Sequence, residues 1–189
     1  RPDVAVVCGI RQEIKPDASL YNWICNIEWN QPAGETTACG GDALFRVAPF
    51  QEVGGFNPAL LAGEEPELCI RLREKGWKIW RLADPMTRHD AAMTRFGQYW
   101  KRAVRSGYGQ ARVAMLHGKS RSGIWMRESL RALAYVCLPV ISLVLVMLIG
   151  VWGLLPLAIF PLQVTRIALR MGAADWRSWG YGTMMMVAK

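Results

Sequence analysis

The sequence feature that constrains this chain most is a run of 33 residues, 132–164, without one Asp, Glu, Lys, Arg or His. A helix that crosses a bilayer needs about 20 apolar residues, so the run is too long for one span and near the minimum for two. Residues 150–153, Gly-Val-Trp-Gly, lie in its middle and offer a turn with a tryptophan suited to the membrane interface. The pattern predicts two short spans, roughly 133–149 and 153–169, that form a transmembrane hairpin. A buried hairpin in a soluble protein is the alternative, although few soluble cores contain so long an uncharged run.

The net charge of +8 is concentrated directly before this run. Residues 1–94 hold 10 Lys/Arg and 13 Asp/Glu, residues 95–131 hold 9 and 1, and residues 132–189 hold 4 and 1. We call residues 95–131 the basic collar, and a polybasic segment next to a span indicates contact with anionic membrane lipids. Basic residues flank the hairpin on both sides and the turn has none, so the positive-inside rule predicts that both flanks are cytoplasmic.

The collar has a second interpretation, as a nucleic-acid surface. Tyr99, Trp100 and Tyr108 lie among its basic residues, as in a surface on which bases stack. The membrane explains the same charge more simply, because the span follows at once. We therefore expect no nucleic-acid partner.

Upstream of the collar, strands alternate with helices, which predicts an α/β class. Strands are expected at 4–8, 43–47 and 77–82, with a turn at Asp84-Pro85 after the last. Helices are expected after a Ser19 cap, at 49–53 before Gly54-Gly55, from Pro66 to Gly76, and from 95 to 116, where Gly107 and Gly109 could interrupt the last. Segment 171–189 follows the hairpin region 132–170, and its apolar end predicts the start of a further membrane or interfacial segment.

The cysteines argue against a disulfide framework or a zinc knuckle. The chain has five, an odd number, and no two are spaced as CxxC, so reduced and mostly buried thiols are expected. The chain starts without Met or a signal peptide, and we expect it to be a fragment of a larger protein.

Three features could carry chemistry. Gly40-Gly41-Asp42 is either a tight turn or a site loop. Glu64 and Glu65 begin a helix, where the helix macrodipole stabilises acidic side chains. A carboxylate there could equally serve as a general base. His89, near Asp84 and Asp90, is either structural or a metal ligand.

In order along the chain, Cys39-Gly40-Gly41-Asp42-Ala43-Leu44-Phe45-Arg46, Val53-Gly54-Gly55-Phe56, Gly63-Glu64-Glu65-Pro66-Glu67-Leu68-Cys69-Ile70-Arg71-Leu72 and His89 resemble the C-terminal half of glycosyltransferase family 2. The hairpin after a basic helix is similar to the membrane-anchored, polysaccharide-forming branch. The resemblance covers nearly the whole chain and is specific as an ordered series. It implies that residues 1–94 are the acceptor half of a Rossmann-like GT-A domain.

The resemblance also implies roles for single residues. Glu65 would be the catalytic base with Glu64 beside it, Gly40, Gly41 and Asp42 would line the substrate site, and His89 would help bind a divalent cation, Mg²⁺ or Mn²⁺. Gln98, Trp100 and Arg102 loosely approximate the QxxRW motif that contacts acceptor and diphosphate. The substrates implied are a nucleotide-sugar donor and a glycan or lipid-linked acceptor, joined with inversion at the cytoplasmic face of a bacterial inner membrane.

The chain departs from the family pattern in three ways. The usual base is Asp rather than Glu, the QxxRW match is weak, and no DxD motif is present. We expect that motif, and most of the cation site, in an N-terminal half that this chain lacks, so that the fragment is inactive alone. The alternative is a non-catalytic membrane-anchored binding or scaffold protein on a degenerate GT-A fold.

Overall fold

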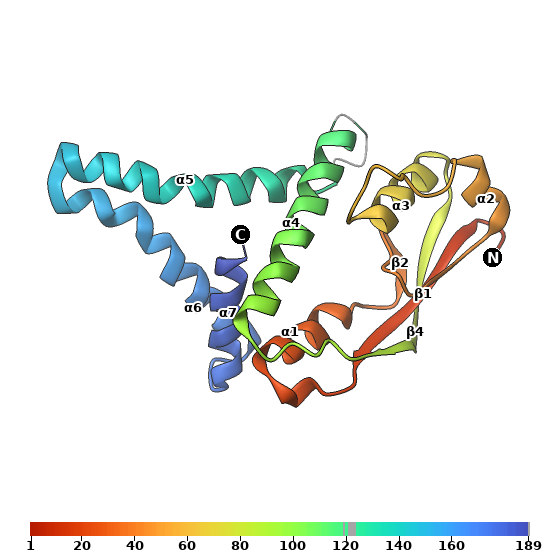
Figure 1. Cartoon of the computed structure of the whole chain (residues 1–189), viewed down its shortest axis with the longest axis horizontal. Helices are drawn as coiled ribbons and strands as arrows, with labels where there is room; N and C mark the ends of the chain where they lie inside the picture. Colours follow the sequence, from red (N-terminus) through yellow and green to blue (C-terminus); the bar gives the residue numbers. More distant parts are fainter. Residues whose placement is uncertain (119, 121–123, 189) are drawn as a thin grey trace. The chain divides into compact units, whose positions relative to one another are not determined.

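The chain forms two compact units, Arg1–Ile124 and Trp125–Lys189. The computed structural model describes residues 1–118, 120 and 124–188 (Figure 1). The boundary between the units falls inside the basic collar, of which Lys119 and Arg121 lie outside the described residues.

The first unit is built on a four-stranded mixed sheet and is of mixed α/β class. Its strands are β1 (Val4–Glu13), β2 (Gly34–Thr36), β3 (Ala43–Phe45) and β4 (Lys78–His89), in the order β2-β4-β1-β3. β1 and β4 pair in parallel, and the two short outer strands pair antiparallel. The helices of this unit are η1 (Pro16–Ala18), α1 (Leu20–Trp29), α2 (Val47–Glu52), α3 (Glu64–Glu74) and α4 (Phe96–His117). The three predicted strands are confirmed, and the three-residue β2 was not predicted.

Local sequence signals explain where the helices begin and end. The Ser19 hydroxyl accepts the backbone N–H of Asn22 and caps α1, as expected. Gly54 and Gly76 take positive φ angles of 82° and 90° just after α2 and α3. α3 begins at Glu64, two residues before Pro66, which still lies in the first turn, where a proline removes no helical hydrogen bond.

The core of the first unit lies between α3 and the sheet. Leu68, Cys69 and Leu72 of α3 are almost fully buried against β1 and β4. Their spacing of three and four residues places them on one face of the helix. The N-terminus of α3 is therefore held at a fixed position next to the sheet.

The predicted turn at Asp84-Pro85 is wrong, because β4 continues to His89. Pro85 pairs with Ile10 where the register between β1 and β4 shifts, and such irregularities tolerate a proline. Gly9 lies at the same point, where an added Cβ would come within 2.3 Å of the Met86 side chain. The missing side chain lets the two strands approach, and β1 extends beyond its predicted end at Cys8.

α4 is one continuous helix, so the considered interruption at Gly107 and Gly109 does not occur. Gly109 packs against the 60–63 loop, where a Cβ would stand 2.8 Å from the Ala62 carbonyl oxygen. Tyr99 stacks on Tyr21 of α1 with ring centroids 5.4 Å apart. One face of α4 is thus part of the core of the first unit.

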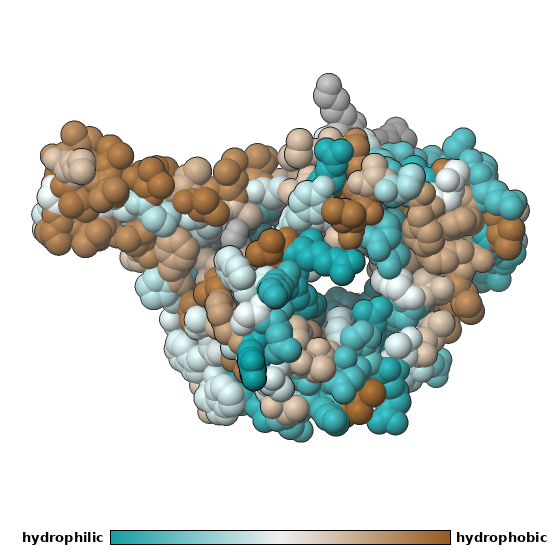
Figure 2. Space-filling model, in the orientation of Figure 1, coloured by the Kyte–Doolittle hydropathy of each residue, from teal (hydrophilic) through white to brown (hydrophobic). Residues whose placement is uncertain are grey.

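The second unit consists of helices: α5 (Met126–Ile149), η2 (Gly150–Ala158), α6 (Ile159–Met171) and α7 (Trp176–Val187). The chain reverses at Gly150, whose φ is 65°, and Gly153 packs against the backbone of α5 near Val146. α5 forms one leg of this hairpin, and η2 with α6 forms the other. The rings of Tyr135 and Phe160, one from each leg, have their centroids 5.8 Å apart. One helical stretch, Met126–Met171, is long and apolar enough to cross a membrane. In Figure 2 hydrophobic residues gather over α5 and η2, around the turn between them.

The five cysteines are free thiols, and all except Cys137 are buried. Cys39 and Cys69 lie side by side, with their sulfur atoms 3.5 Å apart. This contact joins the loop before β3 to the middle of α3.

Candidate functional site

The two acidic residues predicted to be catalytic form the first turn of α3. Gly63 precedes them with φ 84°, a left-handed conformation that suits glycine. Glu65 is half-buried, and Glu64 Oε2 is buried without a hydrogen-bond partner among the described residues. A buried carboxylate oxygen without a partner carries a desolvation cost, so this turn is not optimised for stability.

The glycine-rich loop before β3 lies directly against this turn. A Cβ added to Gly41 would stand 3.3 Å from Glu65 Oε1. One added to Gly40 would stand 3.2 Å from Asp42 Oδ1 and 3.3 Å from Arg11 Nη2. The structure therefore brings Gly40, Gly41, Asp42 and Glu65 together, and the lack of side chains at the two glycines lets the loop backbone approach the neighbouring side chains closely.

The surroundings of Glu65 disfavour its charged form. Burial is the main factor that raises its pKa, and the charges of Glu64 and Asp42 act in the same direction. A backbone hydrogen bond and the charge of Arg11 oppose that rise. A carboxylate with a raised pKa is a better proton acceptor than a solvated one, and such shifts are common at catalytic sites.

Arg11 belongs to this cluster and was not predicted. Its Nη2 donates to Asp42 Oδ1 at 3.0 Å, and its guanidinium group lies over the ring of Trp29, 5.3 Å from the centroid. No periodic signal could have found it, because segment 10–13, Ile-Arg-Gln-Glu, has no alternation that would continue the predicted strand at 4–8 past Gly9. A polar hollow of about 270 Å³ also opens beside it, between β1, α1 and β4.

His89 ends β4 and also contacts Trp29. The two rings meet edge to face at 5.0 Å, and the His89 carbonyl oxygen accepts the backbone N–H of Ile14. Among residues 1–118, 120 and 124–188, no three His, Cys, Asp or Glu side chains are grouped as metal ligands. These residues do not form a metal site by themselves, and metal binding by His89 stays a prediction.

The three residues of the loose QxxRW match do not point to a common place. The Gln98 side chain caps α4, where Oε1 accepts the backbone N–H groups of Thr94 and Arg95 at 2.9 Å. Arg102 donates to Glu28 Oε2 at 2.7 Å, which ties α4 to α1. Trp100 is exposed on another face and lines an apolar groove of about 690 Å³ with Leu61, Val104 and Tyr108. Gln98 and Arg102 thus have structural contacts, and only Trp100 is left free to meet a ligand.

Burial is the largest factor and opposes the charged form of Arg102, but the charge and hydrogen bond of Glu28, with Cys25 and Tyr99, together raise the arginine pKa. This residue therefore stays charged while it holds the helix pair together.

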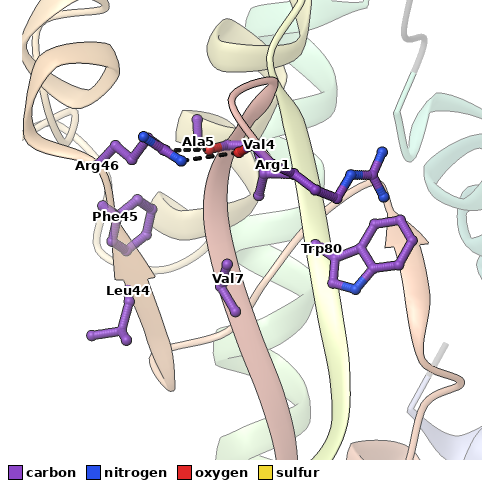
Figure 3. Close-up of a pocket in the computed structure, with 8 residues that line it drawn as sticks. All are labelled: Arg1, Val4, Ala5, Val7, Leu44, Phe45, Arg46 and Trp80. Carbon is purple, nitrogen blue, oxygen red and sulfur yellow. Dashed lines mark hydrogen bonds between the residues drawn. The ribbon is translucent and has the colours of Figure 1, made fainter.

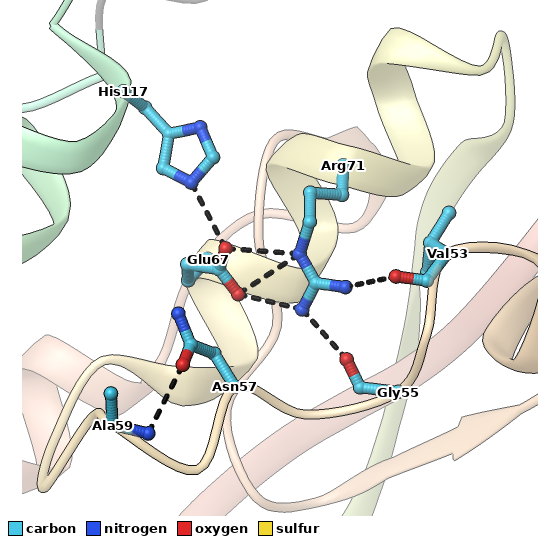
Figure 4. A network of polar contacts seen from close by, with 7 residues as sticks. All are labelled: Val53, Gly55, Asn57, Ala59, Glu67, Arg71 and His117. Atoms are coloured by element: carbon cyan, nitrogen blue, oxygen red, sulfur yellow. Dashed lines mark hydrogen bonds and ion pairs between the residues drawn. The ribbon is translucent and has the colours of Figure 1, made fainter.

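A second polar network lies two residues beyond Glu65 on α3 (Figure 4). Glu67 Oε2 accepts Arg71 Nη2 at 2.6 Å, and Oε1 lies 3.0 Å from His117 Nε2. Arg71 also donates to the carbonyl oxygens of Val53 and Gly55. This network joins α3 to α4 and to the loop after α2.

A second hollow, of about 490 Å³, lies on the face of the sheet that bears Leu44, Val7 and Trp80 (Figure 3). These three side chains form one cross-strand row over β3, β1 and β4. Arg46 closes one end through hydrogen bonds to the Val4 and Arg1 carbonyl oxygens, and Arg1 stacks on Trp80. None of the residues predicted to form the site lines this hollow.

Comparison with known proteins adds no identification. No protein-family model matches the chain, and no curated protein sequence matches it. The function must therefore be argued from the arrangement itself: a carboxylate with a raised pKa, an open glycine loop, and an arginine–aspartate pair between them.

Proposed function

We propose that this chain is the acceptor half and membrane anchor of a family 2 glycosyltransferase with a GT-A fold. It would act in the transfer of a sugar from a nucleotide-sugar donor to a glycan or lipid-linked acceptor. The observation that carries the proposal is the contact between Glu65 and the Gly40–Gly41–Asp42 loop. The resemblance of the ordered motifs supports it.

The chemistry follows from the properties of Glu65. Its carboxylate accepts the proton of the acceptor hydroxyl, whose oxygen then bonds to the anomeric carbon of the donor sugar as the bond to the diphosphate breaks. A single displacement of this kind inverts the anomeric configuration. A divalent cation, when bound, would neutralise charge on the leaving diphosphate. The proton transfer itself is assigned to Glu65.

Gly40 and Gly41 suit contact with a sugar ring, because a backbone without side chains can approach a ligand closely. Asp42 is held by Arg11, which fixes its Oδ1 beside Gly40. The loop is also joined to α3 through Cys39 and Cys69. Substrate loop and base would therefore be positioned by one rigid core.

The test is sugar transfer by the full-length protein in membrane vesicles, with radiolabelled nucleotide sugars offered one at a time. Glu65→Gln should lower kcat/KM by about 10²–10⁴, the usual effect of losing a general base. Glu74→Gln is the matched control, since Glu74 is an exposed glutamate on the same helix. Transfer by Glu65→Gln within about threefold of wild type would remove Glu65 as the base.

A non-catalytic scaffold on the same fold is the second candidate. The structural contacts of Gln98 and Arg102 favour it, because they occupy two of the three residues of the QxxRW-like segment. Equilibrium dialysis separates the two candidates: a scaffold binds a glycan or a nucleotide sugar without turning it over. Product formation with any donor rejects the scaffold.

The second unit supports a membrane location. α5 has 24 residues, which corresponds to about 36 Å of helix. η2 and α6 have 9 and 13 residues and together span about 37 Å. Each leg is thus long enough for a hydrocarbon core of about 30 Å. We infer that the legs cross a bacterial inner membrane twice, with the first unit in the cytoplasm.

This topology is tested by cysteine labelling in spheroplasts. Trp152→Cys, in the exposed turn, should react with a membrane-impermeant maleimide, whereas Ser106→Cys on α4 should react only after lysis. The wild-type protein controls for its own thiols. Labelling of Ser106→Cys in intact spheroplasts would reverse the topology, and protection of Trp152→Cys in both states would exclude a crossing hairpin.

A further inference from the structure

Arg11 is the cation that faces the candidate base most directly. Glu65 Oε1 and Arg11 Nη2 approach the same point, the Cβ position of Gly41, to 3.3 and 3.8 Å. The side chain of Arg11, from β1, and that of Glu65, from α3, therefore lie near the same glycine. A larger residue at position 41 would fill the space between them.

The guanidinium group is held from two directions. Asp42 accepts Nη2 at 3.0 Å, and the side chain of Asp42 is only 8% exposed. The central carbon of the guanidinium group lies over the ring of Trp29, from α1, 5.3 Å from its centroid. A cation that is both paired and stacked has few other rotamers, so its charge stays at a fixed place.

We propose that Arg11 is a positioning residue: it fixes the Gly40–Gly41–Asp42 loop through Asp42, and its charge keeps Glu65 ionised and able to accept a proton. This inference rests on the proposed function for its second part, the ionisation of the base. Its first part, the fixing of the loop, concerns the folded chain alone.

The charges around Glu65 show why such a cation is needed. Glu64 and Cys69 face it from α3, and Asp42 and Cys39 face it from the loop, all of them groups that are neutral or negative. Among the described residues with the largest effects on its pKa, Arg11 is the positive one, and it lowers that pKa against burial. His117 of α4 binds Glu67 instead. Without Arg11, Glu65 would be protonated over a wider pH range.

The experiment uses the full-length protein with Arg11→Gln, Arg11→Lys and, as a control, Arg88→Gln on the neighbouring strand, where Arg88 is exposed. The first measurement is kcat/KM against pH. At pH 7 Arg11→Gln should lose about 10- to 100-fold, as expected for a misplaced site. Its acidic limb should move to higher pH, because the base loses the charge that favours ionisation. Arg11→Lys should restore the limb to its wild-type position, and Arg88→Gln should leave both unchanged.

The second measurement is hydrogen exchange of the backbone amides at 39–42. Loss of the charged hydrogen bond to Asp42 should speed their exchange at least about fivefold in Arg11→Gln, with no change in Arg88→Gln. The ionising role is overturned if the acidic limb of the pH profile does not move in Arg11→Gln. It is also overturned if the limb of Arg11→Lys moves as far as that of Arg11→Gln. Unchanged hydrogen exchange at 39–42 in Arg11→Gln overturns the positioning role.

If the wild type transfers no sugar at all, the proposed function fails. Hydrogen exchange alone then decides whether Arg11 fixes the loop.

Discussion

Two glutamates of α3, only two residues apart, occupy opposite environments. Glu67 is 3% exposed, and both of its carboxylate oxygens have hydrogen-bond partners, which are Arg71 and His117. Glu65 is half-buried beside a second carboxylate, and the cation that faces it, Arg11, pairs with Asp42 instead. One carboxylate is satisfied within the fold, whereas the other is left to interact with what enters the site.

The difference shows how one helix can serve both stability and chemistry. Burial alone would raise the pKa of Glu67, but hydrogen bonds from Arg71 and His117 outweigh it and hold the pKa below its usual range. For Glu65, burial and the neighbouring acids together raise the pKa. A helix places residues two apart on different faces, so the environments do not mix.

The largest expected effect separates activity from stability at Glu65. In Glu65→Gln, sugar transfer should fall by about 10²–10⁴, while the free energy of unfolding stays equal or rises. The amide avoids the cost of burying a charge next to Glu64. Thermal melts in detergent, followed by circular dichroism, measure the stability side. A melting temperature several degrees below wild type would mean that Glu65 is structural like Glu67, and the contrast between the two residues would be lost.

The next effect is on stability, at Glu67. Glu67→Gln removes the charged hydrogen bonds to Arg71 and leaves this largely buried arginine without its carboxylate. The free energy of unfolding should fall by roughly 1.5–3 kcal/mol. Denaturant titration of the same detergent-solubilised protein checks the value. The matched variant is Glu74→Gln, which should change stability by less than about 0.5 kcal/mol. A loss for Glu67→Gln no larger than for the control would contradict the role of the network.

How far this contrast could be predicted from the sequence depends on which contacts are local. The Glu67–Arg71 pair is set by helical spacing, and the ends of α1, α2 and α3 follow from Ser19, Gly54 and Gly76. The mixed α/β class followed in the same way from alternating patterns. The contact of His117 with Glu67 joins residues 50 positions apart, and no periodicity reveals it.

The irregular parts of the sheet were missed for the same reason. The bulged pairing at Gly9 and Pro85 depends on where β1 and β4 meet, so an Asp-Pro sequence suggested a turn instead. Arg11 was overlooked because the predicted strand stopped at that bulge. Gln98 and Arg102 fitted a sequence pattern, but Gln98 is engaged by local capping bonds at the start of α4 and Arg102 by a tertiary contact with α1.

A smaller effect is expected at His117, the last residue of α4. His117→Ala removes one hydrogen bond to Glu67 but leaves Arg71 in place, so unfolding should become easier by about 0.5–1.5 kcal/mol. His117→Gln keeps a donor and should recover part of the loss. The two variants, compared by denaturant titration, measure how much of the network depends on α4. Equal stability of His117→Ala and wild type would confine the network to α3 and the loop after α2.

The smallest effect is the pH dependence of stability, where the two glutamates should act with opposite signs. The folded pKa of Glu67 is lowered, so its contribution is present above the unfolded value near 4.5 and is lost as pH falls through the folded pKa. The folded pKa of Glu65 is raised, so the folded state takes up a proton first. Stability should therefore increase slightly as pH falls from neutral toward 4.5 and then decrease below it. Melting temperatures measured across this range check both changes. The increase toward pH 4.5 should be absent in Glu65→Gln, and the decrease below pH 4.5 should be smaller in Glu67→Gln. If Glu65→Gln instead flattened only the decrease below pH 4.5, the two environments would have been assigned the wrong way round.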